Sequence, residues 1–262
     1  MGERTSYESG TFSWIDLATT DQGAAKQFYA DLFGWEYDDR PIGGDAVYTM
    51  CILDGKEVAA ITTQSDQERG QGVGPHWNSY ITVHDLDDRA PRVPELDGNL
   101  ISPPFDVLEA GRMALVADPT GAVFAMWQPR DNIGASLVNA PGALAWNELA
   151  TTDIDTAKQF YADLFGWTYE DMDMDGAGTY SIIRNGDRSN GGIRGLGPQE
   201  QGAPPYWLAY FGTAGCDESD AKAEQLGGQV PLPTTPLPQG AFSVITDPQG
   251  AGFALFEGHF DD

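Results

Sequence analysis

Apolar and polar positions along the chain form a pattern of strands and helices that occurs twice. Residues 12–18 and 144–150 predict strands, and each leads into the letters Thr-Thr-Asp. Apolar residues then recur at helical spacing, on a face made of Ala25, Phe28, Tyr29, Leu32 and Phe33 in the first copy and of Ala157, Phe160, Tyr161, Leu164 and Phe165 in the second. Asp21 and Asp153 suit helix N-caps, because a carboxylate accepts from the free amides of the first turn. Gly34 and Gly166 suit the helix ends.

The pattern continues with strands around residues 48–53 and 180–184, and a second half-unit begins at Trp77 in one copy and at Trp207 in the other. A strand over residues 77–83 precedes a helical stretch that Pro91 and Pro94 must shorten or break. Its counterpart over residues 221–226 is a cleaner helix. Closing strands are predicted around residues 112–117, 123–128, 242–246 and 252–257. Each half-unit therefore has the order β-α-β-β-β, and there are four half-units.

The repetition extends to the letters of the sequence. Residues 14–35 and 146–167 share W-x-x-L-A-T-T-D and A-K-Q-F-Y-A-D-L-F-G-W at an offset of 132 residues. D-P-T-G-A-V-F-A-M-W at residues 118–127 pairs with D-P-Q-G-A-G-F-A-L-F at residues 247–256. A period this long suits two domains rather than a solenoid. We predict domains over residues 8–130 and 144–260, joined by a Pro/Gly/Ala-rich linker over residues 131–143.

Composition narrows the class of partner. The 40 acidic and 14 basic residues give a net charge of −26, which argues against nucleic acid and anionic membrane surfaces, since both attract Lys and Arg. No apolar run has the length of a membrane-spanning helix, and no ordinary secretion signal is visible. The two cysteines, Cys51 and Cys216, form no CxxC pair. We expect a cytoplasmic protein, a monomer or homodimer, whose partner is a small molecule.

A strand, a capped helix with F-Y-x-x-L-F-G-W, three strands and D-P-x-G before a final strand resemble the vicinal-oxygen-chelate (VOC) superfamily, of the glyoxalase/bleomycin-resistance/dioxygenase type. The duplication resembles the two-domain actinobacterial branch typified by a culture-filtrate antigen, some relatives of which are labelled hydroxylases in antibiotic pathways. The resemblance implies an α+β fold in which tandem βαβββ half-units form two glyoxalase-like domains, each with a U-shaped cleft. It says little about the reaction, because this fold hosts lyases, isomerases, dioxygenases, antibiotic-modifying enzymes and drug-binding proteins.

In that superfamily a divalent metal lies in the cleft, held by His, Glu or Gln. The matching positions here hold Trp14, Asn78 and Ala125 in the first domain and Trp146, Leu208 and Ala254 in the second, and a further position falls near residues 58–61 and 191–193. Trp, Leu and Ala cannot coordinate such a cation, and Asn78 alone is a poor ligand. We therefore predict metal-free clefts and no cofactor. An alignment shifted by two residues would instead bring Asp16, Glu148, His76 or Tyr80 into the ligand row, because alternate strand residues share a face.

The candidate site residues occur in matched pairs, and each pair admits two interpretations. Trp14 and Trp146 form either aromatic walls for a flat ligand or plugs of core. Asp16 and Glu148, two residues further on, are either general acid/base groups or carboxylates in structural hydrogen bonds. The inward phenols bind a polar ligand or satisfy these carboxylates; they are Tyr48, Tyr80, Tyr180 and Tyr210, and Asn78 lies in the same row.

Two functions from different classes follow. The first is a protein that binds, and assists in modifying, a small aromatic or apolar metabolite between aromatic faces in metal-free clefts. The alternative is an enzyme of the superfamily, namely a lyase, isomerase, dioxygenase or antibiotic-tailoring hydroxylase. Such an enzyme would use Asp16 or Glu148 for proton transfer, or a divalent metal as Lewis acid. A purely structural or partner-binding protein is the third interpretation, and it predicts that no small ligand changes the melting temperature.

Overall fold

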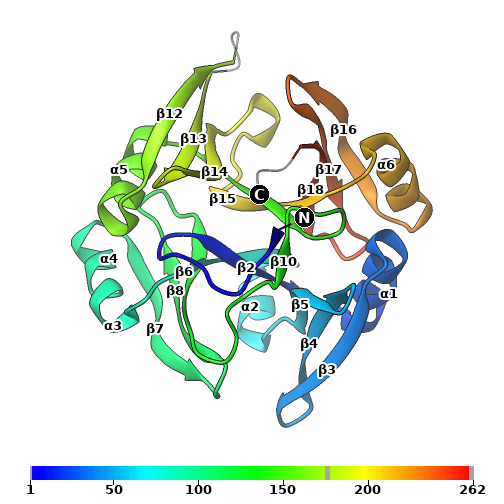
Figure 1. Ribbon diagram of the computed structural model, residues 1–262, viewed down its shortest axis with the longest axis horizontal. Coiled ribbons are helices and arrows are strands. Elements are labelled where there is room, and N and C mark those ends of the chain that lie inside the picture. Colours follow the sequence, from blue (N-terminus) through cyan, green and yellow to red (C-terminus); the bar gives the residue numbers. More distant parts are fainter. Residues whose placement is uncertain (1, 175–177, 260–262) are drawn as a thin grey trace.

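The computed structural model in Figure 1 describes residues 2–174 and 178–259 and consists mainly of two curled, eight-stranded sheets. The first sheet contains only strands of the first repeat, in the order β3-β4-β5-β2-β6-β9-β8-β7. Its strands are β2 (Phe12–Thr19), β3 (Glu36–Gly43), β4 (Ala46–Leu53), β5 (Lys56–Thr63), β6 (His76–Thr82), β7 (Asn99–Val107), β8 (Gly111–Ala117) and β9 (Val123–Pro129). The α+β class and the β-α-β-β-β order of the half-units are confirmed.

The second sheet repeats this order with the strands of the second repeat, β12-β13-β14-β11-β15-β18-β17-β16. Its strands are β11 (Leu144–Thr151), β12 (Thr168–Asp173), β13 (Thr179–Asn185), β14 (Arg188–Gly195), β15 (Tyr206–Gly212), β16 (Gln229–Leu237), β17 (Gly240–Thr246) and β18 (Gly252–Gly258). In each sheet the two half-units meet at an antiparallel pair, β2 with β6 and β11 with β15. The two sheets therefore follow the two sequence repeats. Residue 260, the last of the predicted second domain, lies outside the described residues.

The predicted helix signals operate as expected. Asp21 accepts the amide of Ala24 at 2.9 Å at the start of α1 (Gln22–Phe33), and Asp153 accepts the amide of Thr156 at 3.0 Å at the start of α5 (Ile154–Phe165). Gly34 ends α1 with a φ of 78°, in the left-handed region that glycine adopts without a Cβ clash.

The remaining helical segments are short. Pro91 separates α3 (Leu86–Arg89) from α4 (Arg92–Glu95), and α6 (Cys216–Gln225) is the longer counterpart in the second repeat. Two further segments lie between the half-units, α2 (Asp66–Gly70) and the 3₁₀ turn η1 (Pro198–Glu200). Among the described helices, none is long and apolar enough to cross a membrane.

The hydrophobic cores, unlike the sheets, are shared between the repeats. Figure 1 shows α1 beside α6 and α5 beside α3 and α4, so each helix of one repeat lies against a half-unit of the other. The Tyr29 hydroxyl donates to Asp247 Oδ2 at 3.1 Å, and the Tyr161 hydroxyl donates to Asp118 Oδ2 at 3.0 Å. Both carboxylates also accept three backbone amides within their own D-P-x-G turns. The D-P-x-G motif thus joins the two repeats.

The segment predicted as a linker contributes to a core. Ala135, Leu137 and Val138 are buried in the cluster that also contains α1. The short strand β10 (Leu137–Val138) pairs with β1 (Gly2–Glu3), and the Trp35 indole donates to the Gly142 carbonyl at 2.8 Å. The connection between the domains is therefore a packed element near the centre of the molecule, as Figure 1 shows.

Candidate functional site

The five predicted site residues of the first repeat come together on one face of the first sheet. In the strand register Trp14 lies opposite Tyr80 and Asp16 lies opposite Asn78, while Tyr48 reaches them from β4. We call Trp14, Asp16, Tyr48, Asn78 and Tyr80 the N-terminal cluster. Because alternate residues of a strand share a face, this grouping follows from the residue parity that the sequence shows.

Asp16 is the acceptor at the centre of the N-terminal cluster. Its Oδ2 accepts the Tyr80 hydroxyl at 2.7 Å and the Tyr48 hydroxyl at 3.0 Å, and its Oδ1 accepts Asn78 Nδ2 at 2.9 Å. The Trp14 indole in turn donates to the Tyr48 hydroxyl at 2.9 Å. Burial raises the pKa of Asp16, although these three donors act in the opposite direction. The phenols therefore serve as hydrogen-bond donors to the carboxylate, which is the structural interpretation of these residues.

The four predicted residues of the second repeat form a matching group, with one addition. Trp146 lies opposite Tyr210, and the Trp146 indole donates to the Tyr180 hydroxyl at 3.0 Å. Burial, and then the nearby Glu148 carboxylate to which both phenols are hydrogen-bonded, raise the pKa of Tyr180 and Tyr210. Arg194 Nε also donates to Glu148 Oε1, at 2.7 Å. We call Trp146, Glu148, Tyr180, Tyr210 and Arg194 the C-terminal cluster.

Arg194 is the residue that the sequence analysis missed. It lies opposite Tyr180 and beside Ala150, and the same place in the first sheet holds Thr62, opposite Tyr48 and beside Ala18. The 132-residue offset alone pairs Arg194 with Thr62, so the signal was present in the repeat. Leu208, the counterpart of Asn78, gives Glu148 no polar partner on that side. In the second repeat a guanidinium takes the place of the amide as a partner of the carboxylate.

The two clusters differ in their exposure. In the N-terminal cluster Trp14 is 5% exposed and belongs to the large core around α1. Trp127, the aromatic residue on the strand that follows the D-P-x-G turn, belongs to the same core. Their counterparts Trp146 and Phe256 are only partly buried. They belong to a separate small apolar group with Leu208, Tyr210 and Ala254, extended by Tyr206, Phe242 and Val244. The second repeat therefore exposes more of its tryptophan and of its D-P-x-G-strand aromatic, whereas Tyr80 and Tyr210 are both buried and Tyr48 and Tyr180 are both partly exposed.

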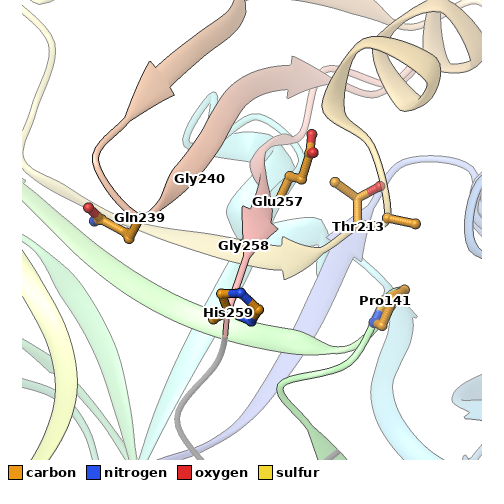
Figure 2. Close-up of a pocket in the computed structure, with 8 residues that line it drawn as sticks. Pro141, Thr213, Gln239, Gly240, Glu257, Gly258 and His259 are labelled. Carbon is orange, nitrogen blue, oxygen red and sulfur yellow. The ribbon is translucent and has the colours of Figure 1, made fainter.

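Two surface hollows of the described residues lie away from both clusters. Figure 2 shows one, of about 520 Å³, at the end of β18, where His259 and Glu257 face Gln239, Thr213 and Pro141. The other, of about 440 Å³, lies beside α5 and is lined by Lys158, Trp167 and Tyr169 among others. Neither hollow is lined by a residue of either cluster.

The chemistry of these residues does not fit the metal of the superfamily. Each cluster offers one carboxylate, which already accepts from phenols and from an amide or a guanidinium, and the indole of each cluster donates to a phenol. No described group of three or more His, Cys, Asp or Glu side chains is placed to hold a metal ion. Divalent cations need several anionic or imidazole donors with free lone pairs. Neither cluster therefore forms a site for that metal.

Comparison with known proteins agrees with the sequence resemblance. The profile of the Glyoxalase/Bleomycin resistance protein/Dioxygenase superfamily matches residues 11–126. The chain is 42% identical over 259 residues to "Putative glyoxylase CFP32" of Mycobacterium tuberculosis (strain CDC 1551 / Oshkosh), covering 98% of both chains. It is 34% identical over 263 residues to "Anthracycline biosynthesis protein DnrV" of Streptomyces peucetius, covering 97% of this chain and 95% of the relative. The chain belongs to the glyoxalase/bleomycin resistance protein/dioxygenase superfamily, as its repeat and D-P-x-G turns predicted.

Solved structures confirm the fold over nearly the whole chain. The Mn(II)-bound glyoxalase from Novosphingobium aromaticivorans matches 97% of this chain and 85% of its own, with a TM-score of 0.66 and 16% identity. The 2,3-dioxygenase LapB from Pseudomonas sp. KL28 matches 97% of this chain and 94% of its own, with a TM-score of 0.68 and 14% identity. At such low identities the structural similarity shows a common fold and does not indicate which reaction, if any, the site performs.

Proposed function

We propose that this protein binds a small, flat aromatic metabolite at the C-terminal cluster. The observation that carries the proposal is the partly buried aromatic group around Trp146, which its N-terminal counterpart lacks. Flat ligands are held by apolar burial against aromatic faces, with a few polar groups that fix their orientation. Tyr180, Tyr210 and Arg194 would supply those polar groups, because they lie on the same face as Trp146.

The curated relatives support the class of ligand. Two streptomycete relatives are named anthracycline biosynthesis proteins, and anthracyclines are flat, fused-ring compounds. Such a ring system matches an aromatic lining in shape and polarity.

Calorimetric titration with 2-naphthol, a neutral fused-ring phenol, tests the proposal. We expect Trp146→Phe to weaken binding by about tenfold, because one indole face and its hydrogen-bond donor are lost. The matched control is Trp14→Phe, which makes the same change in the N-terminal cluster and leaves binding unchanged. Equal effects of the two variants, or the absence of binding to the wild-type protein, would contradict the proposal.

A second candidate function is proton transfer at Asp16, and one observation favours it. Burial raises the pKa of the Asp16 carboxyl, and a carboxylate with a raised pKa is a stronger base than an ordinary one, as proton abstraction requires. We expect catalysed deuterium exchange at the activated CH₂ of 2-tetralone that collapses in Asp16→Asn and persists in Glu148→Gln. If 2-tetralone exchanges no faster with the protein than without it, this candidate is wrong.

A further inference from the structure

Arg194 has more anionic partners than the C-terminal cluster alone supplies. Besides Glu148 on β11, its guanidinium meets Glu200, with Nη1 to Oε2 at 2.6 Å and Nη2 to Oε1 at 3.0 Å. Two parallel bonds between a guanidinium and a carboxylate form the fork geometry by which arginine recognises acids. Glu200 occupies the two amino groups that would otherwise face an incoming acid.

Glu200 reaches Arg194 from a loop. It ends the three-residue η1 turn between Gly197 and Gly202, and its carboxylate also accepts the Gly197 amide at 2.7 Å and the Tyr206 hydroxyl. Burial would raise the pKa of Glu200, but hydrogen bonds from Arg194, Tyr206 and Gly197 outweigh it and lower the pKa to about 2. The same carboxylate therefore holds the loop closed and remains ionised against Arg194.

The first repeat has the loop and the glutamate but lacks the cation. Glu68 corresponds to Glu200, and it caps α2 through the amide and hydroxyl of Ser65. Its other oxygen lies 4.0 Å from His76 Nε2, and the arginine position of the sheet holds Thr62. The capping role is thus common to both loops, whereas the fork on a sheet arginine belongs to the second repeat alone.

We propose that Glu200 is an internal stand-in for the acidic group of the ligand, so that the C-terminal cluster selects an aromatic carboxylate. The ligand's carboxylate would replace Glu200 on Arg194, its rings would lie against Trp146 and Tyr206, and the loop over residues 196–205 would open. The exchange keeps the local charge constant, because one carboxylate replaces another beside Glu148. This inference rests on the proposed function and names its ligand class.

Titration with 2-naphthoate, compared with neutral 2-naphthol, tests the exchange. Glu200→Gln keeps an acceptor for the Gly197 amide but removes the charge that competes for Arg194. An internal competitor lowers the apparent affinity of a ligand by the fraction of time for which the competitor is bound. We therefore expect 2-naphthoate to bind Glu200→Gln about tenfold more tightly than it binds the wild-type protein. The matched control Glu68→Gln leaves affinity unchanged. Adding Arg194→Thr to Glu200→Gln, which copies Thr62, removes the gain and the preference for 2-naphthoate over 2-naphthol.

Hydrogen exchange of the wild-type protein gives a readout that needs no variant. We expect 2-naphthoate to speed exchange of the amides over residues 196–205 while the amides over residues 64–75 are unchanged. If 2-naphthol binds through Trp146 but Glu200→Gln alters 2-naphthoate affinity by less than twofold, or loop exchange is unaffected, the stand-in role is wrong and the proposed function stands. If neither compound binds to any variant, the proposed function itself fails.

Discussion

The N-terminal and C-terminal clusters are built from corresponding strands of the two sheets at the same register, yet the tryptophan of the first is buried and that of the second is partly exposed. In the first, Asp16 is enclosed by three neutral donors and Trp14 belongs to the large core. In the second, Glu148 faces Arg194, and Trp146 belongs to a small, partly exposed group. The duplicated scaffold supplies two equivalent positions, and a few substitutions, chiefly Thr62 against Arg194 and Asn78 against Leu208, separate their roles.

The largest expected effect is on stability at the paired tryptophans. Trp14→Ala should lower the free energy of unfolding by about 3–4 kcal/mol, because it leaves a cavity in a closed core. Trp146→Ala should cost roughly half as much, because that side chain is partly exposed. Urea unfolding of both variants measures the difference. Equal losses would mean that both clusters are core, which would break the comparison.

The carboxylates should show a smaller difference. Asp16→Ala leaves the hydroxyls of Tyr48 and Tyr80 and the amide of Asn78 without their acceptor, and we expect a loss of about 2–3 kcal/mol. Glu148→Ala should cost somewhat less, about 1–2 kcal/mol, because Arg194 keeps the fork to Glu200 while the hydroxyls of Tyr180 and Tyr210 lose their acceptor. Chemical unfolding at pH 7 compares the two. A larger loss for Glu148→Ala would place the structural carboxylate in the second cluster instead.

The pH dependence of stability sharpens the same contrast. Burial raises the pKa of Asp16 in the folded state above its ordinary value of 3.8, so the folded protein holds this proton more tightly than the unfolded chain. The associated stability is complete below the unfolded pKa and is lost as pH rises through the folded pKa. Asp16→Asn carries no such proton, so the wild-type protein should lose stability relative to this variant over the pH range that begins at the ordinary pKa of 3.8 and extends upward. Parallel unfolding curves across that range would contradict the predicted pKa direction.

The smallest expected effect lies in the first loop. Glu68 is 35% exposed and its partner His76 is 4.0 Å away, so Glu68→Gln should change the free energy of unfolding by less than about 0.5 kcal/mol. Thermal unfolding checks this value. Because the same variant is the binding control, a larger loss would require a different control for Glu200→Gln.

Sequence patterns predicted the elements and their duplication because these depend on contacts within a few residues. Asp21, Asp153, Gly34 and Gly166 act on adjacent turns, and strand parity alone grouped Asp16 with Trp14. The predicted linker over residues 131–143 differs from these elements, because its apolar residues pack in a core with α1, which is far away in sequence. Its role in the core could not be deduced from a composition of Pro, Gly and Ala.

The sequence by itself determined the fold, the superfamily and the two matched rows of aromatic and acidic side chains. The tertiary structure decided which of the two tryptophans is enclosed, that the two cores are shared across the repeats through Tyr29 and Tyr161, and that Arg194 lies between Glu148 and Glu200. The physical reason is that exposure and ion pairing depend on which distant loops and half-units close over a side chain. Neighbours in the sequence set its direction on a strand but not what covers it.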